Sequence, residues 1–308
     1  MRDTFVRVLA DEMAQDPNIV LIIGDLGFGV MKPIWERFPD RIINAGIAEQ
    51  SMIGLAAGLA ATGKTVLVYS IGNFPVMRPL EQIRNDCAYH NANVKIVCVG
   101  GGFVYGSLGM SHHATEDLAV MRALPDVRVF APGDPAETGI VTREIIHTPG
   151  TCYMRLGRGS EPMVHTGISV EWKAPSPFTL RKGKDIALLS TGGILTQTVQ
   201  AAERLAGKNI WAEVVSFPCI KPMDTDAVKG LLKRFRHLVT VEEHNIIGGL
   251  GSAVCEIAAE AGTGSKIHRI GLQDCYSTIV GNQQYLREVY GMDEKTIADK
   301  AEAWLNEA

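Results

Sequence analysis

One acidic residue, Glu49, stands at the start of a strongly apolar stretch of chain. The residues before it, Asn44-Ala45-Gly46-Ile47-Ala48, lead into residues 51–58, which are almost wholly Met, Ile, Leu, Ala and Gly. A glutamate in the first turn of a helix is favoured by the helix dipole and needs no further role. Position alone therefore leaves two interpretations open for Glu49: an ordinary helix start, or a carboxyl group with a chemical function.

Two adjacent histidines, His112 and His113, follow Gly109-Met110-Ser111 in a loop that leads into a predicted helix at Thr115. Imidazole suits contacts with hydroxyl groups and proton transfer, because its unperturbed pKa lies near neutrality. Ordinary surface histidines are one alternative, and a metal site that pairs His112 with Glu116 is another. The sequence offers no evident third ligand, so we predict no metal site.

An arginine, Arg155, ends a predicted strand within Tyr153-Met154-Arg155-Leu156-Gly157-Arg158. A guanidinium group suits bidentate contact with a phosphate or another anion. Arg158 is a second candidate for such a contact. For either residue, a structural salt bridge across a domain boundary is the alternative.

The elements that position these residues alternate between extended and helical patterns over the first part of the chain. Short apolar runs predict strands at residues 19–23, 42–44, 66–69, 94–99, 127–130 and 152–155. Helical patterns lie between most of them, at residues 49–61, 79–90, 115–124 and 135–147. Such alternation predicts a mainly parallel sheet with helices on both faces.

A second unit of the same class follows a stretch rich in Pro, Gly and Ser. Further strands are predicted at residues 186–190, 211–215, 237–241 and 266–270, with helices ending at residues 206, 261 and 305. We therefore expect two consecutive doubly wound α/β domains, at residues 1–165 and 183–308, joined by a linker at residues 166–182.

Composition narrows the classes of function. The chain has 308 residues, of which 46% are hydrophobic and 21% charged, a profile typical of a globular protein with a large core. Its net charge of −4, without blocks of like charge, argues against a nucleic-acid partner or an anionic membrane surface. The six cysteines include no CxxC pair, and neither a secretion signal nor a long apolar run is present. We expect a soluble, cytoplasmic protein.

Several short motifs follow one another along the chain. In order they are Gly24-Asp25-Leu26, Gly46-Ile47-Ala48-Glu49-Gln50, Gln82-Ile83-Arg84-Asn85-Asp86, Gly109-Met110-Ser111-His112, Met121-Arg122-Ala123-Leu124-Pro125 and Ala131-Pro132-Gly133-Asp134. This ordered set resembles the pyrimidine-binding domain of the transketolase family, and a looser similarity continues to the end of the chain. The resemblance implies the fold of that family and the transfer of a two-carbon ketol unit from a ketose to an aldose, with thiamine diphosphate and Mg²⁺ as cofactors.

The resemblance also implies how this chain meets the cofactor. Glu49 would be the catalytic glutamate that hydrogen-bonds N1′ of the aminopyrimidine, and burial would favour the protonated carboxyl group that can donate this bond. Ile47 and Phe74 would contact the cofactor, with Phe74 stacked on the pyrimidine ring. A plain core phenylalanine is the alternative for Phe74.

For the substrate, the resemblance implies that His112 is catalytic and contacts donor hydroxyls, with His113 beside it and Arg155 as the anchor for the donor's phosphate. Two positions depart from the family pattern: Gly100 stands where a phosphate-binding histidine is usual, and Leu108 stands where an acidic residue meets a donor hydroxyl. We therefore expect a donor other than an ordinary pentulose phosphate, such as a sulfonated ketose or one with a differently placed phosphate.

A further departure implies a second polypeptide. In this family, a domain with a G-D-G motif followed by an asparagine holds the diphosphate and Mg²⁺, and no such segment occurs in this sequence. We therefore expect an N-terminal transketolase subunit as partner, in an α2β2 heterotetramer whose partner chain supplies the Mg²⁺ ligands. Two alternatives stay open: the beta chain of a 2-oxo acid dehydrogenase, and a non-catalytic assembly subunit of the same fold. Glu49 argues against the second, because an inactive subunit has no reason to keep that carboxylate.

Overall fold

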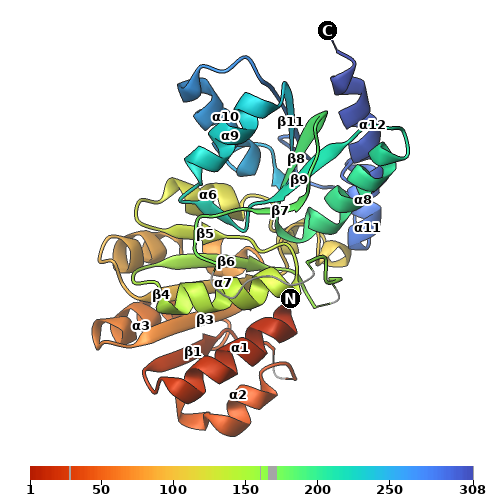
Figure 1. The fold of residues 1–308 in the computed structure, drawn as a ribbon. Helices are drawn as coiled ribbons and strands as arrows, with labels where there is room; N and C mark the ends of the chain where they lie inside the picture. The colour runs from red at the N-terminus through yellow and green to blue at the C-terminus, as the bar shows by residue number, and fades with distance from the viewer. Residues whose placement is uncertain (28, 160, 166–171, 308) are drawn as a thin grey trace.

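The computed structural model describes residues 1–27, 29–159, 161–165 and 172–307. Two layered units lie one above the other, with the N-terminal helix in the lower unit and the C-terminal helix in the upper one (Figure 1). Each unit is a mainly parallel sheet flanked by helices, which confirms the predicted fold class. None of the helices in the described ranges is long and apolar enough to cross a bilayer.

The sheet of the lower unit has seven strands in the order β10-β5-β6-β4-β3-β1-β2. They are β1 (Ile19–Ile23), β2 (Ile42–Asn44), β3 (Thr65–Ile71), β4 (Val94–Val99), β5 (Arg128–Phe130), β6 (Cys152–Leu156) and β10 (Cys219–Lys221). All neighbouring pairs are parallel except β10 with β5. Because parallel strands end at the same edge, the loops after β2, β3 and β4 all leave from one side of this unit.

Helices cover both faces of this sheet, because successive strand residues point to opposite sides. Leu67 belongs to a core beneath α1 (Arg2–Gln15), α2 (Lys32–Arg37) and α7 (Pro135–His147). Its neighbour Val68 belongs to a second core. The helices over that second core are α3 (Glu49–Ala61), α5 (Leu80–Gln82), the π-helix η2 (Ile83–Ala88) and α6 (Asp117–Ala123).

The sheet of the upper unit has five strands in the order β12-β11-β8-β9-β7. They are β7 (Phe178–Arg181), β8 (Ile186–Thr191), β9 (Ala212–Ser216), β11 (His237–Asn245) and β12 (Lys266–Leu272). One face carries α8 (Leu195–Ala206), α11 (Gln283–Val289) and α12 (Glu294–Leu305), and the other carries α9 (Thr225–Arg234) and α10 (Leu250–Ala261). The core under α9 and α10 is continuous with the core under α3 and α6, so the two units share buried apolar packing.

Two features of the junction were not expected from the sequence. The strand β7 lies inside the predicted linker and pairs antiparallel with β9, so residues 178–181 belong to the second sheet. The short strand β10 comes from the second half of the chain yet pairs with β5 of the first sheet. Strands of three or four residues are too short to show a readable period, which explains why the sequence pattern predicted neither pairing. Residues 166–171 of the linker lie outside the described residues, and the domain boundaries stay a prediction.

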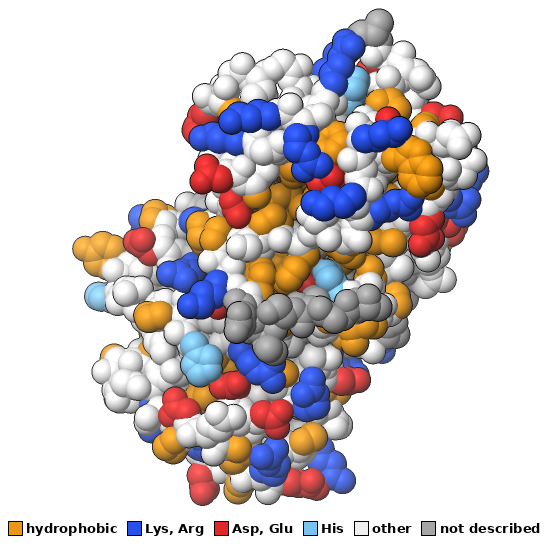
Figure 2. All heavy atoms as spheres, viewed as in Figure 1, with side chains coloured by type: hydrophobic (Ala, Val, Ile, Leu, Met, Phe, Trp, Pro, Cys, Tyr) orange, Lys and Arg blue, Asp and Glu red, His pale blue; other side chains and the backbone are white. Residues whose placement is uncertain are grey.

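Charged side chains of both signs are interspersed over the face shown in Figure 2, and hydrophobic side chains gather between the two units. This agrees with the small net charge of −4. No broad field of one sign is visible on that face.

Candidate active site

Glu49 is the first residue of α3, as the sequence predicted. The turn before it is held by Asn44 at the end of β2, whose Oδ1 accepts the backbone N–H groups of Asp25 and Gly46, each at 3.0 Å. Gly46 has φ +72°, a left-handed conformation that side-chain-bearing residues rarely adopt. The loop after β1 and the start of α3 are thereby fixed to one another at the carboxyl edge of the sheet.

The Glu49 side chain is 5% exposed, and its carboxylate meets one cation. Nη1 of Arg78 donates to both carboxylate oxygens, at 2.8 and 2.9 Å. The same guanidinium group lies over the ring of Phe74, with 4.2 Å from Cζ to the ring centroid. Sequence reasoning did not single out Arg78, which is 29 residues from its partner.

Phe74 begins the short helix α4 (Phe74–Met77) and brings His112 to the same place. The two rings meet edge to face, with centroids 5.1 Å apart. Behind them, Nδ2 of Asn73 donates to the carbonyl oxygen of His113 at 3.2 Å, which fastens the histidine loop to the turn after β3. The structure therefore brings three of the predicted site residues into one row of contacts: Glu49 pairs with Arg78, Arg78 lies over Phe74, and Phe74 meets His112.

Ile47 and His113, the other two predicted residues of this region, have contrasting surroundings. Ile47 is 74% exposed and lines a hollow of about 450 Å³ together with Glu49 and Arg78. His113 is only 3% exposed, packs edge-on against Phe103 and lies 3.4 Å from the carbonyl oxygen of Gly106. Burial lowers the pKa of His113. His113 also borders a hollow together with Asn73 and Glu116, and its predicted substrate contact stays a prediction.

Arg155 lies inside the junction of the two units rather than on an open surface. Its side chain is 7% exposed, with Nη1 3.3 Å from Oδ1 of the fully buried Asp117 and Nη2 donating to the carbonyl oxygen of Glu243. Tyr153, two residues earlier on β6, donates to the other oxygen of Asp117. The guanidinium group of Arg155 therefore already has buried partners: its ion pair with Asp117 lies within the first unit, and its bond to the second unit is to a backbone carbonyl oxygen.

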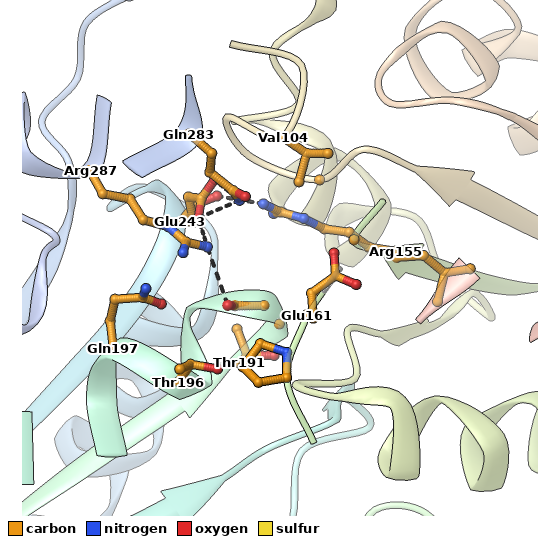
Figure 3. A pocket seen from close by; sticks show the side chains of 15 residues that line it. Val104, Arg155, Glu161, Thr191, Thr196, Gln197, Glu243, Gln283 and Arg287 are labelled. Carbon is orange, nitrogen blue, oxygen red and sulfur yellow. Dashed lines mark hydrogen bonds and ion pairs between the residues drawn. The ribbon is translucent and has the colours of Figure 1, made fainter. Parts of the chain in front are cut away.

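The neighbouring side of this junction holds a second buried ion pair (Figure 3). Glu243 lies between Arg287, whose Nε donates to Oε2 at 2.6 Å, and Gln283, whose Nε2 lies 2.9 Å from Oε1. The backbone N–H of Phe103 donates to the same Oε1 at 2.6 Å. These bonds tie α11 and β11 to the loop after β4, and a cavity of about 130 Å³ remains beside them.

Arg158, the second arginine candidate, is exposed, and its guanidinium carbon lies 5.7 Å from the centroid of the Tyr105 ring. Tyr105 in turn lies against Gly100, where an added Cβ would overlap the ring. Gly100 also has φ +99°. The position that departs from the family's histidine is thus held to glycine both by its backbone and by the neighbouring tyrosine.

The hollow beside Glu49 suits a flat ring that carries hydrogen-bonding nitrogens. The guanidinium group of Arg78 is itself such a group: planar, stacked on Phe74, and donating to the buried carboxylate. An aminopyrimidine ring would find the same aromatic face and the same carboxyl group. The residues present therefore fit the pyrimidine half of thiamine diphosphate.

Comparisons with known proteins agree with this geometry. The family model for the transketolase pyrimidine-binding domain matches residues 1–163, and that for the transketolase C-terminal domain matches residues 178–297. An apulose-4-phosphate transketolase subunit of Actinobacillus succinogenes is 38% identical, over 87% of this chain and 86% of the relative. A 6-deoxy-6-sulfo-D-fructose transketolase subunit of a Clostridium species is 34% identical, over 98% of this chain and 93% of the relative. A solved structure described as a split-gene transketolase, inactive beta4 tetramer, superposes with a TM-score of 0.90 at 33% identity, covering 99% of this chain and 97% of that one.

Proposed function

This chain belongs to the transketolase family, and we propose that Glu49, Phe74, Ile47 and His112 form its share of a thiamine diphosphate site. It is the C-terminal subunit of a split transketolase, a transferase that moves ketol units and acts with a partner subunit. The observation that carries the proposal is the buried Glu49 carboxylate at the start of α3, linked through Arg78 to the ring of Phe74 and so to His112.

Thiamine diphosphate, when bound, supplies the reactive carbon through which the carbon–carbon bond next to the donor's carbonyl group is cleaved and the ketol unit passes to the acceptor. Glu49 would hold the pyrimidine by its ring nitrogen N1′. Its burial supports this role, because a hydrogen bond to a desolvated carboxyl group is stronger than one in water. The tie between Asn44, Asp25 and Gly46 would keep the carboxyl group in position during turnover.

Phe74 and Ile47 would enclose the ring, since aromatic stacking contributes about 0.5–1.5 kcal/mol beyond the area it buries. The 74% exposure of Ile47 supports a position that a cofactor or a partner covers. His112 would face the donor from the opposite side of the Phe74 ring. Its Nδ1 lies 3.0 Å from the hydroxyl of Ser111, which would orient the imidazole toward donor hydroxyls.

The partner subunit would hold the diphosphate and supply the Mg²⁺ ligands, in an α2β2 assembly. Two relatives named as transketolase subunits support the need for a partner. The related solved structure described as an inactive beta4 tetramer supports the idea that subunits of this type are inactive alone.

The donor would be an anionic ketose other than an ordinary pentulose phosphate. Gly100 cannot become a histidine without moving Tyr105, so the usual phosphate-binding side chain has no room there. The relatives named for apulose 4-phosphate and for 6-deoxy-6-sulfo-D-fructose support a donor that carries a phosphate or a sulfonate. Arg155 was predicted as the anchor, but its buried bonds leave the exposed Arg158 as the better-placed cation.

Substitution of Glu49 by glutamine tests the proposal in the assembled two-subunit enzyme. Turnover should fall by roughly 10²–10⁴, the usual contribution of one acid–base group. Folding and assembly should persist, because glutamine is tolerated at a helix start. Glu294→Gln is the matched control, since Glu294 likewise begins a helix, α12, and pairs with an arginine at 2.9 Å. Equal turnover in the Glu49→Gln variant and the wild type would contradict the proposal.

A further inference from the structure

The cation paired with Glu49 occupies the place that the cofactor's ring would need. Nη1 of Arg78 donates to both carboxylate oxygens, so the exposed side of the carboxylate is already bonded. The same guanidinium group lies 4.2 Å from the centroid of the Phe74 ring. A pyrimidine stacked on this face of Phe74 and bonded to Glu49 would overlap with it, since stacked rings need a comparable separation.

The pairing also opposes the function proposed for Glu49. Both carboxylate oxygens are bonded to Arg78, so the carboxyl group is not available to a ring nitrogen while the pair persists. The cation and the ring therefore compete in two ways, for space on Phe74 and for the carboxyl group of Glu49.

Arg78 has an open route out of the site. Its side chain is 47% exposed while that of Glu49 is 5% exposed. The guanidinium group can therefore leave the carboxylate by rotating into water, where its charge is solvated. The backbone of Arg78 is fixed meanwhile: its N–H donates to the carbonyl oxygen of Phe74 at 3.3 Å, and its carbonyl oxygen accepts from Nε2 of Gln50 at 3.4 Å. Displacement thus requires side-chain rotation only.

We propose that Arg78 closes the pyrimidine site of the free subunit and is displaced from Glu49 when the cofactor's ring enters. This inference rests on the proposed function of Glu49 and Phe74. Arg78 then sets the affinity for the cofactor, because each binding event must break the ion pair. In the free subunit the same pair satisfies a buried carboxylate that would otherwise be unpartnered.

Binding of thiamine diphosphate to the assembled enzyme, followed by calorimetry in the presence of Mg²⁺, tests the inference without relying on activity. The Arg78→Ala variant should bind the cofactor roughly 3- to 30-fold more tightly than the wild type. This range corresponds to the free energy of one charge-assisted hydrogen bond, reduced because Arg78 is partly exposed to solvent. Arg7→Ala is the matched control: Arg7 is an exposed arginine on α1 whose ion pair is with Asp11, at 3.8 Å, and its loss should leave the affinity unchanged.

The double variant Arg78→Ala/Glu49→Gln separates this inference from the function on which it rests. If Arg78 acts through Glu49, the tightening should shrink in the Glu49→Gln background. An Arg78→Ala affinity equal to or weaker than that of the wild type overturns the displacement model, and a weaker one shows that Arg78 supports the bound cofactor. If Glu49→Gln changes neither the cofactor affinity nor turnover, the proposed function itself fails.

Discussion

Two arginines near the end of β6, Arg155 and Arg158, should respond in opposite ways to substitution by alanine. Arg155 is 7% exposed and bonded to Asp117 and to the carbonyl oxygen of Glu243. Arg158 is exposed beside Tyr105. We expect Arg155→Ala to lower stability and Arg158→Ala to lower the efficiency with anionic donors.

The expected loss of stability in Arg155→Ala follows from the burial of the ion pair. Asp117 is fully buried, and without the guanidinium group it keeps only the hydroxyl of Tyr153 among its side-chain partners in the described structure. Breaking a buried ion pair by removing one partner costs about 3–5 kcal/mol. Loss of an exposed side chain such as Arg158 should change the free energy of unfolding by less than about 0.5 kcal/mol. Urea unfolding of the two variants measures this difference.

The expected loss of efficiency in Arg158→Ala follows from the exposure of its guanidinium group, for which the described residues show no ion pair. Loss of one charge-assisted hydrogen bond to a donor's anion costs about 1.5–3 kcal/mol, or roughly 10- to 150-fold in kcat/KM. The assay compares xylulose 5-phosphate, fructose 6-phosphate, a sulfonated ketose and an unphosphorylated ketose in the assembled enzyme. The kcat/KM for the unphosphorylated ketose should be the same in Arg158→Ala as in the wild type. If Arg158→Ala affects neutral and anionic donors equally, or if Arg155→Ala has the stability of the wild type, the assignment of the two arginines is wrong.

Three further outcomes follow from the same structure. The isolated chain should bind thiamine diphosphate feebly, so tight Mg²⁺-dependent binding in a calorimetric titration of this chain alone would contradict the divided site. Burial raises the pKa of Glu137 to about 7 from 4.5, so the folded state favours its protonated form. The free energy of unfolding should therefore fall as pH rises from about 4.5 to 7, by up to about 1.4 kcal/mol per pH unit. In the Glu137→Gln variant, the urea concentration at the unfolding midpoint should vary less with pH over this range. Gly100→Ala should destabilise the chain by about 1–3 kcal/mol, because Gly100 has φ +99° and its new Cβ would overlap the ring of Tyr105; thermal unfolding checks this, and an unchanged melting temperature would show that Tyr105 moves freely.

Much of the fold could be predicted because the apolar residues of its helices and strands recur with clear spacing. The strands at residues 19–23 and 94–99 and the helices at residues 49–61 and 135–147 have the predicted bounds. The predicted helix at residues 79–90 is instead a short α-helix followed by a π-helix. The spacing of apolar residues does not distinguish these two helix types.

The candidate site could be predicted where a residue's role depends on its own segment. Glu49 begins its helix because Gly46 and Asn44 make the turn before it, and both lie in the segment that leads directly into the helix. Arg78 could not be found this way, since its importance comes from a partner 29 residues away. The choice between Arg155 and Arg158 likewise depended on which side chain the junction buries, and that follows from packing between the two units.

The central claim is that Glu49 acts on the cofactor's pyrimidine, and proton exchange at the thiazolium carbon tests it most directly. Exchange into deuterated water, followed by NMR in the assembled enzyme, measures the step that this carboxyl group is proposed to promote. We expect exchange to slow in Glu49→Gln in parallel with turnover, by roughly 10²–10⁴, and to keep its wild-type rate in Glu294→Gln. Exchange at the wild-type rate in a fully assembled, cofactor-bound Glu49→Gln enzyme would show that Glu49 is not the activating residue.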